Sequence, residues 1–401
     1  MARAKMQEGL QLTILIVGAG HAGGTAAATL RQLGCDEPIA IIGDEPHLPY
    51  QRPPLSKAWL KGDVAFAAVG LRPQAFYDQR NIALRPGVRV TAIDPIAHAV
   101  TLDSGEVLPY RALILATGAR PRRMGIDGED LPGVFALRSI ADADVIKAGL
   151  LPGRRMVVIG GGYIGLEVAA SARAKGMDVV VIERESRLMA RVASPALSAF
   201  VQSYHERQGV AFRLEAAVAG LVSEGGRVCG VRLADGRSET ADMVLVGIGA
   251  VPNVELAQAA GIACNNGIVV DLEARTSAPD IYAIGDCTER PLPHYGCRMR
   301  LESVASAIEQ ARQAAAAICG SKPPAPEVPW FWSDQYDLKI QIAGLPIGAA
   351  STDVRGSIDD GKFAVVHLAA DGRTCAVEAI NLPAEYMAGR ATIGKQRAVG
   401  A

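Results

Sequence analysis

Two short apolar runs near the start of the chain predict two parallel β-strands joined by a helix. Residues 14–17 (ILIV) and residues 39–42 (IAII) are apolar and rich in β-branched side chains, which is typical of strands buried on both faces of a parallel sheet. Gly18, Gly20 and Gly23 follow the first run in G-x-G-x-x-G spacing, and small residues continue after them. The pattern predicts a strand, a glycine turn, a closely packed helix and a second strand.

An acidic residue after the second run completes a pattern that favours dinucleotide binding. Asp44 lies about twenty positions beyond the last glycine of the turn. In such a unit the glycines allow backbone N–H groups to approach a pyrophosphate bound at a helix N-terminus. The acid accepts a hydrogen bond from a ribose hydroxyl. A glycine turn that binds nothing is the alternative, but the strand before this turn and the acid after it favour a nucleotide site.

Residues 156–183 repeat the same pattern. The run MVVIG leads into Gly160, Gly162 and Gly165, and a helix of small residues is followed by the run VVVIE, which ends at Glu183. Two complete patterns in one chain predict two bound dinucleotides, which neither pattern alone would indicate.

The acid of the second pattern bears on the choice between NADH and NADPH. A carboxylate at Glu183 would accept a hydrogen bond from the 2′-hydroxyl of NADH and repel a 2′-phosphate, which favours NADH. Arg184 and Arg187 lie close by in the sequence, and either guanidinium could hold a phosphate. NADPH therefore stays open as the alternative.

Two later apolar runs end in glycine-containing turns that suit a close approach of the backbone to a ligand. The run ALILATGARPR places Thr117 and Gly118 after a buried strand, and DIYAIGDC places Asp286 after another. A helix is predicted over residues 303–318. Its N-terminus would stabilise negative charge on a reduced flavin if it faced one.

Proline-rich segments mark loops and a linker. Four prolines in residues 46–54 forbid a helix or a central strand, so we expect an extended loop, after which Ser56 caps a helix. Arg52 and Lys57 follow the first nucleotide pattern, and they are either solvated or face phosphate or flavin. Residues 321–329 (SKPPAPEVP) predict a linker before a final segment of strands.

Composition narrows the class of protein. The 401 residues are 49 % hydrophobic and 21 % charged, which is ordinary for a globular protein of two or three domains. Lysine and arginine total 41 against 42 for aspartate and glutamate, which argues against a nucleic-acid partner. Residues 1–13 have no apolar core of signal-peptide length and no run approaches a membrane span, so we expect a cytoplasmic protein without membrane contact.

Cysteine and histidine usage excludes several kinds of chemistry. The seven cysteines form no C-x-x-C or C-x₄-C motif, which argues against a redox disulfide, an iron–sulfur cluster and a zinc site. We expect free thiols and no bound metal. The six histidines are scattered, and no Ser-His-Asp constellation is evident, so no side-chain nucleophile is expected.

In chain order, the motifs GAGHAG, GDEPHLPYQRPPLSK, ATGARPR, GGGYIGLEVAA, VVVIE, YAIGDC, RLESVASAIEQAR and PWFWSDQ resemble one family. It comprises the FAD-containing, NADH-dependent ferredoxin reductases of the putidaredoxin reductase type, which are related to apoptosis-inducing factor. The resemblance spans nearly the whole chain, although most relatives carry a longer C-terminal tail, which bears on part of the docking surface and on any dimer contact there.

The resemblance implies an α/β fold with two Rossmann-like dinucleotide-binding domains of the glutathione reductase kind and a small α+β C-terminal domain. The implied divisions are an FAD-binding domain over 1–118 and 246–325, an NADH-binding domain over 119–245, and a C-terminal domain over 326–401.

The same resemblance implies the site residues. For FAD they are Gly18, Gly20, Ala22, Gly23, Asp44, Glu45, Arg52, Lys57, Asp286, Val304 and Trp332, and for NADH they are Gly160, Gly162, Gly165 and Glu183. Further cofactor contacts are expected at Val90, Thr117, Gly118, Arg138, Ile164 and Gly249. Lys57 and Glu167 are expected to act as electrostatic positioning groups near the two reacting rings, and Trp332 lies on the electron-exit side of the flavin.

The implied activity is an NADH-dependent ferredoxin reductase, in which FAD takes a hydride from NADH and single electrons pass to a [2Fe–2S] ferredoxin. That ferredoxin would supply a cytochrome P450 or a Rieske-type ring-hydroxylating dioxygenase. Arg298 and Arg300 are expected near the docking surface, because a basic rim speeds the encounter with an acidic ferredoxin. Each of these residues also has a purely structural interpretation. Glu167 could be a carboxylate favoured at the start of a helix, Trp332 could be an aromatic residue of the core, and the two arginines could lie on a solvated face.

Three other functions share this architecture. An NADH oxidase or NADH:quinone reductase, and an NADH-binding redox sensor, are compatible with the motifs. A flavin disulfide reductase needs a cysteine pair near the flavin, and the spacing of the cysteines argues against it. We expect a monomer or a homodimer.

Overall fold

The computed structural model describes residues 13–393 and divides into two compact units. Two expectations rest on residues outside this range: the absence of a signal peptide before residue 13, and the contribution of the C-terminal tail to docking. Unit 1 comprises the described part of Met1–Gln51 together with Phe66–Ala119 and Pro252–Glu327, and unit 2 comprises Arg52–Ala65, Arg120–Val251 and the described part of Val328–Ala401.

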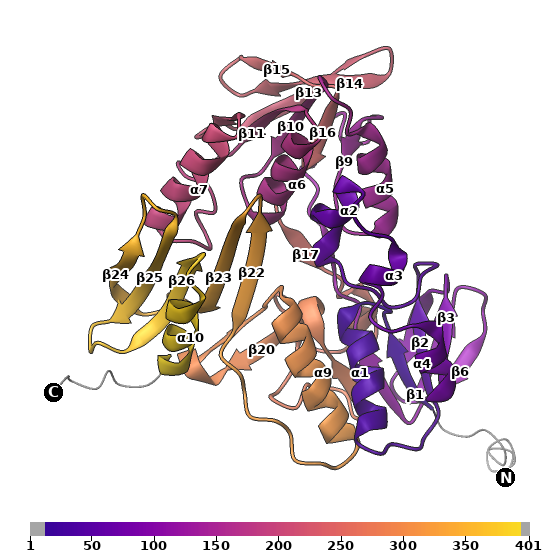
Figure 1. The fold of residues 1–401 in the computed structure, drawn as a ribbon. Coiled ribbons are helices and arrows are strands. Elements are labelled where there is room, and N and C mark those ends of the chain that lie inside the picture. Colours follow the sequence, from indigo (N-terminus) through magenta and orange to yellow (C-terminus); the bar gives the residue numbers. More distant parts are fainter. Residues whose placement is uncertain (1–12, 394–401) are drawn as a thin grey trace, which may run out of the picture. The chain divides into compact units, whose positions relative to one another are not determined.

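Unit 1 is built on a parallel sheet that contains the first predicted nucleotide pattern (Figure 1). The first predicted strand, β1, pairs with the second, β2, and on its other side with β7. The strand order is β19-β7-β1-β2-β3, with β1 (Ile14–Val17), β2 (Ile39–Gly43), β3 (Ile82–Pro86), β7 (Ala112–Leu115) and β19 (Ile281–Ala283).

Alternate side chains of β1 enter two different cores. Ile14 and Ile16 pack against helices α1 (His21–Gln32) and α9 (Val304–Ile318), which lie side by side in Figure 1. Leu15 and Val17 face the opposite core, which includes the antiparallel sheet β4-β5-β6. Because both faces are covered, a continuous apolar run rather than an alternating one is what this strand requires.

The remaining elements of unit 1 surround this sheet. They are α3 (Phe66–Val69), α4 (Gln74–Gln79), β4 (Val90–Asp94), β5 (Ala99–Leu102), β6 (Val107–Pro109), α8 (Glu255–Ala259), β18 (Ile268–Val269), the 3₁₀ turns η2 (Gly285–Cys287) and η3 (Pro293–Tyr295), β20 (Thr288–Leu292) and β21 (Cys297–Met299).

Unit 2 contains a second parallel sheet with the second nucleotide pattern. The strand order is β12-β11-β10-β16-β9, with β9 (Val134–Phe135), β10 (Arg155–Ile159), β11 (Asp178–Ile182), β12 (Val210–Arg213) and β16 (Met243–Val246). The helices are α2 (Ala58–Lys61), α5 (Ile140–Gly149), α6 (Tyr163–Ala174) and α7 (Pro195–Arg207), with the 3₁₀ turn η1 (Pro53–Ser56). A three-stranded antiparallel sheet is formed by β13 (Val218–Glu224), β14 (Arg227–Leu233) and β15 (Ser238–Thr240).

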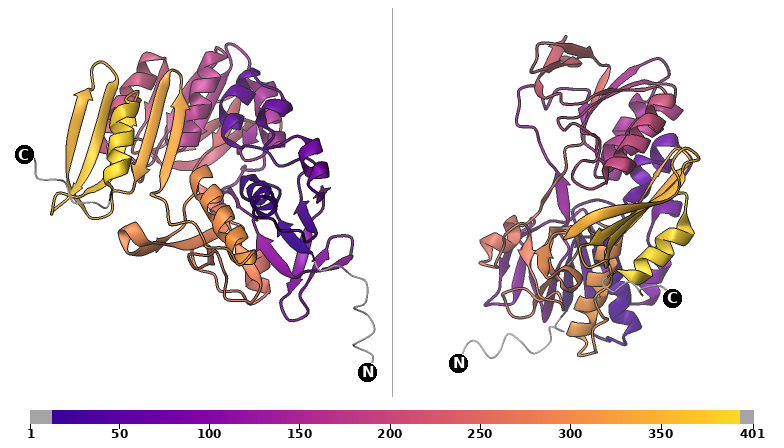
Figure 2. Two further views of the ribbon diagram at one scale, coloured as in Figure 1. Left: turned by 60° about the horizontal axis from the view of Figure 1, so that its bottom comes forward. Right: turned by 90° about the vertical axis from the view of Figure 1, so that its left-hand side faces the viewer.

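The last part of unit 2 is an antiparallel sheet in the order β22-β23-β26-β25-β24, with α10 (Pro383–Thr392) against it (Figure 2). Its strands are β22 (Trp330–Gln335), β23 (Leu338–Gly344), β24 (Ala349–Ser357), β25 (Lys362–Ala369) and β26 (Thr374–Ile380). Phe363 of β25 packs edge-on against Phe200 of α7, so this sheet shares an apolar core with that helix.

The chain passes between the units at five places, two of them within the short strands β8 (Ala119–Pro121) and β17 (Ala250–Pro252). The proline-rich segment Arg52–Ala65 belongs to unit 2, although the sequence on both sides of it belongs to unit 1. In the described part of the chain, no helix is long and apolar enough to cross a membrane.

Two nucleotide cradles and a buried charged cluster as candidate sites

The first glycine turn of unit 1 has the geometry of a pyrophosphate cradle. Gly18 has φ +119°, and a Cβ there would overlap the carbonyl oxygen of Ala116, so no other residue fits. A Cβ on Gly23 would overlap the carbonyl oxygen of Gly18, which keeps α1 close under the turn. Gly20, the N-cap of α1, faces open space, so its position leaves room for a phosphate at the helix N-terminus.

The second glycine turn, in unit 2, repeats this steric design. Gly160 has φ +106°, and its Cβ would overlap the carbonyl oxygen of Gly247, while a Cβ on Gly165 would overlap that of Gly160. Gly162, the N-cap of α6, has open space before it, as Gly20 has. Both turns therefore fit the diphosphate of a dinucleotide.

The acids that follow the two turns are held differently. Asp44 is exposed and pairs with Arg89 at 3.2 Å, while Glu45 accepts a hydrogen bond from the Tyr50 hydroxyl at 2.6 Å. Glu183 is fixed toward its own glycine turn, because its carboxylate accepts from the backbone N–H of Gly161 at 2.7 Å.

The two arginines beside Glu183 are not equally available to a 2′-phosphate. The Arg187 guanidinium donates to the carbonyl oxygens of Ala190 and Ala193 and to Ser198 Oγ, each at 2.7 Å. The side chain of Arg184 is 80 % exposed and pairs with Glu185 at 3.1 Å. Arg187 is thus committed to its own loop, which weakens the case for NADPH.

Asn253 braces the predicted FAD contact at Thr117 and Gly118. The Thr117 hydroxyl donates to the Asn253 carbonyl oxygen at 2.7 Å, and the Asn253 amide donates back to the Thr117 carbonyl oxygen at 2.8 Å. Gly118 has φ +65° and accepts from the Asn253 backbone N–H at 2.9 Å. Sequence reasoning missed Asn253, which follows a valine-proline pair 136 positions beyond Thr117.

Asp286 lies in the turn η2, within electrostatic reach of His21 on the first turn of α1. Burial lowers the pKa of His21, and the nearby Asp286 carboxylate opposes that shift. Gly285 has φ +81° and approaches Ala22 closely. The end of β19 therefore meets the start of α1, so Asp286, Ala22 and the first glycine turn share one edge of the unit 1 sheet.

The structure places several more of the predicted cofactor residues in different surroundings. The Val90 side chain is buried in the core on the sheet face opposite α1. Val304 begins α9, whose N-cap Ser303 accepts from the Ser306 N–H. In unit 2, Arg52 donates to the Arg138 carbonyl oxygen at 2.5 Å. Ile164 is exposed on the first turn of α6, and Gly249 has φ +105°.

Unit 2 also contains a buried charged cluster around Glu167, on α6. The Glu167 side chain is 2 % exposed, and its Oε2 lies 2.6 Å from the Lys57 ammonium and 2.5 Å from Ser56 Oγ. Its Oε1 accepts from Ser333 Oγ at 2.6 Å. Ser171 Oγ donates to the Ser56 carbonyl oxygen at 2.7 Å, which fastens the segment carrying Lys57 to α6.

The structure corrects one expectation and adds one residue here. Ser56 does not cap a helix, because α2 begins after Lys57 and has no side-chain cap; its hydroxyl is directed to Glu167 instead. Ser333 was visible only as part of PWFWSDQ, and nothing in its spacing indicated a partner 166 positions away.

Trp332 precedes Ser333 on β22 and stacks on Trp330, with ring centroids 5.6 Å apart.

In unit 1, Arg298 donates to the carbonyl oxygens of Val270 and Glu289, and Arg300 pairs with Glu302 with only 11 % of its side chain exposed. Both guanidiniums are therefore engaged within unit 1.

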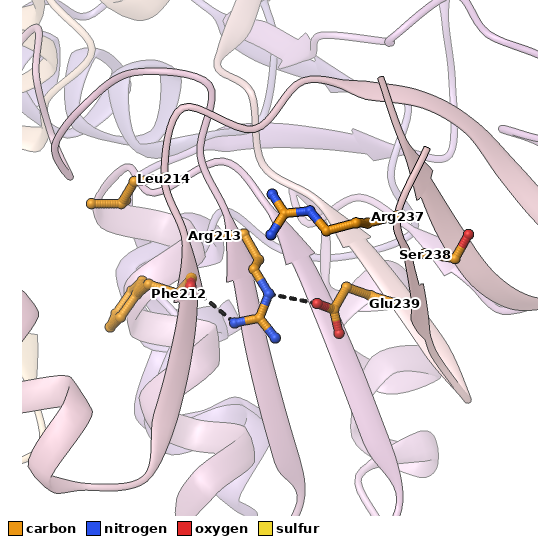
Figure 3. A pocket seen from close by; sticks show the side chains of 6 residues that line it. All are labelled: Phe212, Arg213, Leu214, Arg237, Ser238 and Glu239. Carbon is orange, nitrogen blue, oxygen red and sulfur yellow. Dashed lines mark hydrogen bonds and ion pairs between the residues drawn. The ribbon is translucent and has the colours of Figure 1, made fainter. Parts of the chain in front are cut away.

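One cavity of about 580 Å³ lies on unit 2, at the end of β12 (Figure 3). Arg213 crosses it to bond Glu239 at 2.6 Å. It contains none of the predicted cofactor residues; its lining comprises Phe212, Arg213, Leu214, Arg237, Ser238 and Glu239.

Comparison with known proteins agrees with the two cradles. Residues 12–311 match the pyridine nucleotide-disulphide oxidoreductase family, and residues 330–401 match the reductase C-terminal family. Two dinucleotide cradles on parallel sheets define an oxidoreductase of this class, and the chain belongs to the pyridine nucleotide-disulphide oxidoreductase family.

Within that family the chain groups with ferredoxin reductases. It is 47 % identical to the probable ferredoxin reductase CtmF of Castellaniella defragrans, over 95 % of this chain and 93 % of that protein. It is 44 % identical to rhodocoxin reductase of Rhodococcus erythropolis, over 94 % and 88 %. The structure of a covalent putidaredoxin reductase–putidaredoxin complex matches with a TM-score of 0.93 at 40 % identity, over 96 % of this chain and 93 % of that chain.

These findings confirm the predicted family, the fold class, and FAD and NAD(H) as cofactors. The enzyme is an oxidoreductase of the ferredoxin reductase kind. The individual site residues and the three-domain division stay predictions.

Proposed function

We propose that this protein is an NADH-dependent ferredoxin reductase whose acceptor is a [2Fe–2S] ferredoxin serving a cytochrome P450 or a ring-hydroxylating dioxygenase. The observation that carries the proposal is the pair of glycine cradles with one steric design in one chain. The names of the relatives, which include rhodocoxin reductase and putidaredoxin reductase, support the choice of acceptor.

We assign the cradle of unit 1 to FAD and that of unit 2 to NADH. In unit 1, the N-terminus of α1 binds the diphosphate, Asp44 and Glu45 face the adenosine ribose, and Asp286 faces the ribityl chain. In unit 2, the N-terminus of α6 binds the diphosphate and Glu183 faces the ribose. The three-domain division given above follows this assignment.

When bound, FAD supplies the chemistry that accepts a hydride from the nicotinamide and releases electrons one at a time. The chain's own contribution is to bind, orient and balance charge. Lys57 and Glu167 form an ion pair at 2.6 Å in a site that excludes most water, so both side chains are held in place and the pair carries no net charge. Neither residue needs to transfer a proton.

The cysteines support direct electron transfer without a thiol relay. All seven lie among the described residues and none is in a disulfide. Cys287 follows Asp286 directly, and burial raises the pKa of its thiol. A protonated, buried thiol is a poor nucleophile, so it is unsuited to accept electrons from a flavin.

The proposal extends to partners and location. The ferredoxin docks near Arg298, Arg300 and Trp332, a terminal oxygenase is served indirectly, and the enzyme works in the cytoplasm as a monomer or homodimer. Nucleic acid and membrane take no part.

The test is reduction of cytochrome c by the purified protein with NADH or NADPH, with and without a panel of [2Fe–2S] ferredoxins. We expect a yellow protein that prefers NADH and reduces cytochrome c rapidly only with a ferredoxin. Equally rapid reduction of oxygen or a quinone without ferredoxin would identify an oxidase or quinone reductase. Slow turnover with every acceptor, together with a long-lived long-wavelength absorbance, would identify a redox sensor.

A further inference from the structure

We propose that Ser333 is a positioning residue for the Glu167 carboxylate, and that Gln335 and His205 fix the direction in which Ser333 donates. This inference rests on the proposed function and on the expectation that Lys57 and Glu167 act near the two reacting rings. It assigns a role in hydride transfer to three residues of unit 2 outside both glycine cradles.

The geometry at Glu167 separates its two oxygens. Oε2 pairs with the Lys57 ammonium and accepts a hydrogen bond from the Ser56 hydroxyl, and both groups belong to the proline-rich segment. Oε1 receives Ser333 Oγ at 2.6 Å, from the C-terminal sheet. The carboxylate is therefore held from two sides, and Ser333 supplies the hold on the side away from Lys57.

The direction of the hydrogen bonds follows from the acceptor-only character of a carboxylate. Ser333 has one hydroxyl proton, and the bond to Glu167 uses it. Ser333 Oγ must therefore accept from Gln335, whose Nε2 lies 3.1 Å away. The Gln335 Oε1 is then an acceptor, and it lies 2.8 Å from His205 Nε2. His205 consequently carries its proton on Nε2.

The environment of His205 maintains this arrangement. Its side chain is fully buried, with the Tyr336 ring centroid 5.0 Å away and that of Phe212 6.3 Å away. His205 Nδ1 has no hydrogen-bond partner among residues 13–393. A proton on Nδ1 would be buried without an acceptor, which costs free energy, so the neutral tautomer with Nε2–H is favoured. The lowered pKa of His205, which is caused chiefly by burial, agrees with this tautomer.

Each donor in the series thus points toward Glu167. Hydrogen bonds to an ionised acceptor are short and stronger than neutral ones, and the 2.6 Å separation fits that description. Because Trp332 and Ser333 are consecutive on β22, they point to opposite faces of the sheet. The bond to Glu167 therefore also fixes β22 against α6 at the residue next to Trp332.

The experiment compares Ser333→Ala, Ser333→Thr, Glu167→Gln and the double variant Ser333→Ala/Glu167→Gln. Ser351→Ala, on exposed strand β24 of the same sheet, is the matched control. The rate of flavin reduction by NADH is measured by stopped flow, with ferricyanide as the steady-state acceptor, and the stability of each purified variant is measured by urea unfolding.

We expect Ser333→Ala to slow flavin reduction about tenfold, which corresponds to about 1.4 kcal/mol, with little change in the KM for NADH. Ser333→Thr, which retains the hydroxyl, should recover most of the rate, and Ser351→Ala should have no effect. In the Glu167→Gln background, Ser333→Ala should add less than about twofold and should shift the urea midpoint less than it does alone. Such non-additivity is the signature of a contact and not of general packing.

Gln335→Glu tests the direction of the series without creating a cavity. A second carboxylate beside Ser333 would compete for its proton, so we expect a loss of rate similar to that of Ser333→Ala. Equal effects of Ser333→Ala in both Glu167 backgrounds, or failure of Ser333→Thr to restore the rate, would overturn the inference. If the parental enzyme itself lacks NADH-dependent ferricyanide reduction, the proposed function fails instead.

Discussion

The two glycine cradles have one steric design but carry different residues at the position two after the third glycine. In α1 that residue is Thr25, and the helix around it is small and apolar. In α6 it is Glu167, which binds Lys57 and two serines in a buried site. A buried charge costs free energy unless it is paired, so its retention in one helix only suggests different tasks. In the proposed assignment, the cradle of unit 1 only binds its nucleotide, whereas unit 2 adds a buried charged pair beside its cradle.

The largest expected effect comes from filling the open position of each cradle. Gly20 and Gly162 have φ near −83° and −82° and face open space, so alanine fits both backbones without strain. We expect Gly20→Ala to weaken FAD binding more than about 10²-fold and to give a colourless protein, because the methyl group occupies the phosphate position. Gly162→Ala should remain yellow but show a KM for NADH raised to a similar extent. The ratio of flavin absorbance to protein, and steady-state kinetics with ferricyanide, measure the two effects. A yellow Gly20→Ala enzyme with impaired NADH binding would reverse the assignment of the cradles.

The next effect concerns the buried Glu167 carboxylate of α6, which has no counterpart at the matching position of α1. Glu167→Gln leaves the Lys57 ammonium without its counter-charge, so we expect flavin reduction by NADH to slow about 10²-fold. The urea midpoint should also fall, because breaking a buried pair costs several kcal/mol. The exposed pair Lys61–Asp63 is the control, and Asp63→Asn should alter neither quantity. A rate unchanged in Glu167→Gln would limit the pair to a structural role.

Stability should depend on pH in unit 2 through His205. Burial lowers the pKa of folded His205 to about 4, against 6.5 for an ordinary histidine. Above pH 6.5 neither state binds the proton and the full stability is present. As the pH falls from 6.5 toward 4 the unfolded chain binds it first, so the free energy of unfolding decreases, by about 3 kcal/mol in total. Urea unfolding across this range measures the slope, and His205→Gln, which retains a donor at the same position, should reduce it. An identical slope in that variant would assign the acid sensitivity to other groups.

A smaller effect is expected on the choice of nicotinamide cofactor. Glu183→Ala should reduce the ratio of kcat/KM for NADH to that for NADPH about tenfold, because it removes the repulsion of a 2′-phosphate. Asp44→Ala, at the corresponding position of unit 1, should leave this ratio unchanged. Unaltered selectivity in Glu183→Ala would remove that residue from the ribose site.

The smallest effect is expected at the docking surface. Arg300→Glu should raise the KM for ferredoxin about fivefold at low salt and leave ferricyanide reduction intact, since rim charges act chiefly on association. Arg300 pairs with Glu302 and is mostly buried, so equal losses with both acceptors would show that it supports unit 1 and not the partner.

The sequence sufficed for features that depend on neighbouring residues. The runs at 14–17 and 156–159, the glycine turns after them and the acids at Asp44 and Glu183 are local patterns. Sterics dictate the first and third glycine of each turn. It did not suffice where partners come from distant segments. The position of Ser56 after a proline-rich loop predicts a helix cap, and only the fold directs its hydroxyl to Glu167, 111 positions away. Arg187 could not be separated from Arg184 until the loop that it binds was known.

The central claim is that electrons pass from NADH through a flavin in this protein to a one-electron iron–sulfur acceptor, without a thiol intermediary. An anaerobic titration tests it most directly: NADH is added to the purified protein, and a [2Fe–2S] ferredoxin is added afterwards. We expect NADH to bleach the flavin absorbance and ferredoxin to restore it, with the same result after all thiols are alkylated. A protein without flavin absorbance, or a bleached flavin that ferredoxin leaves unchanged and that only a disulfide substrate restores, would contradict it.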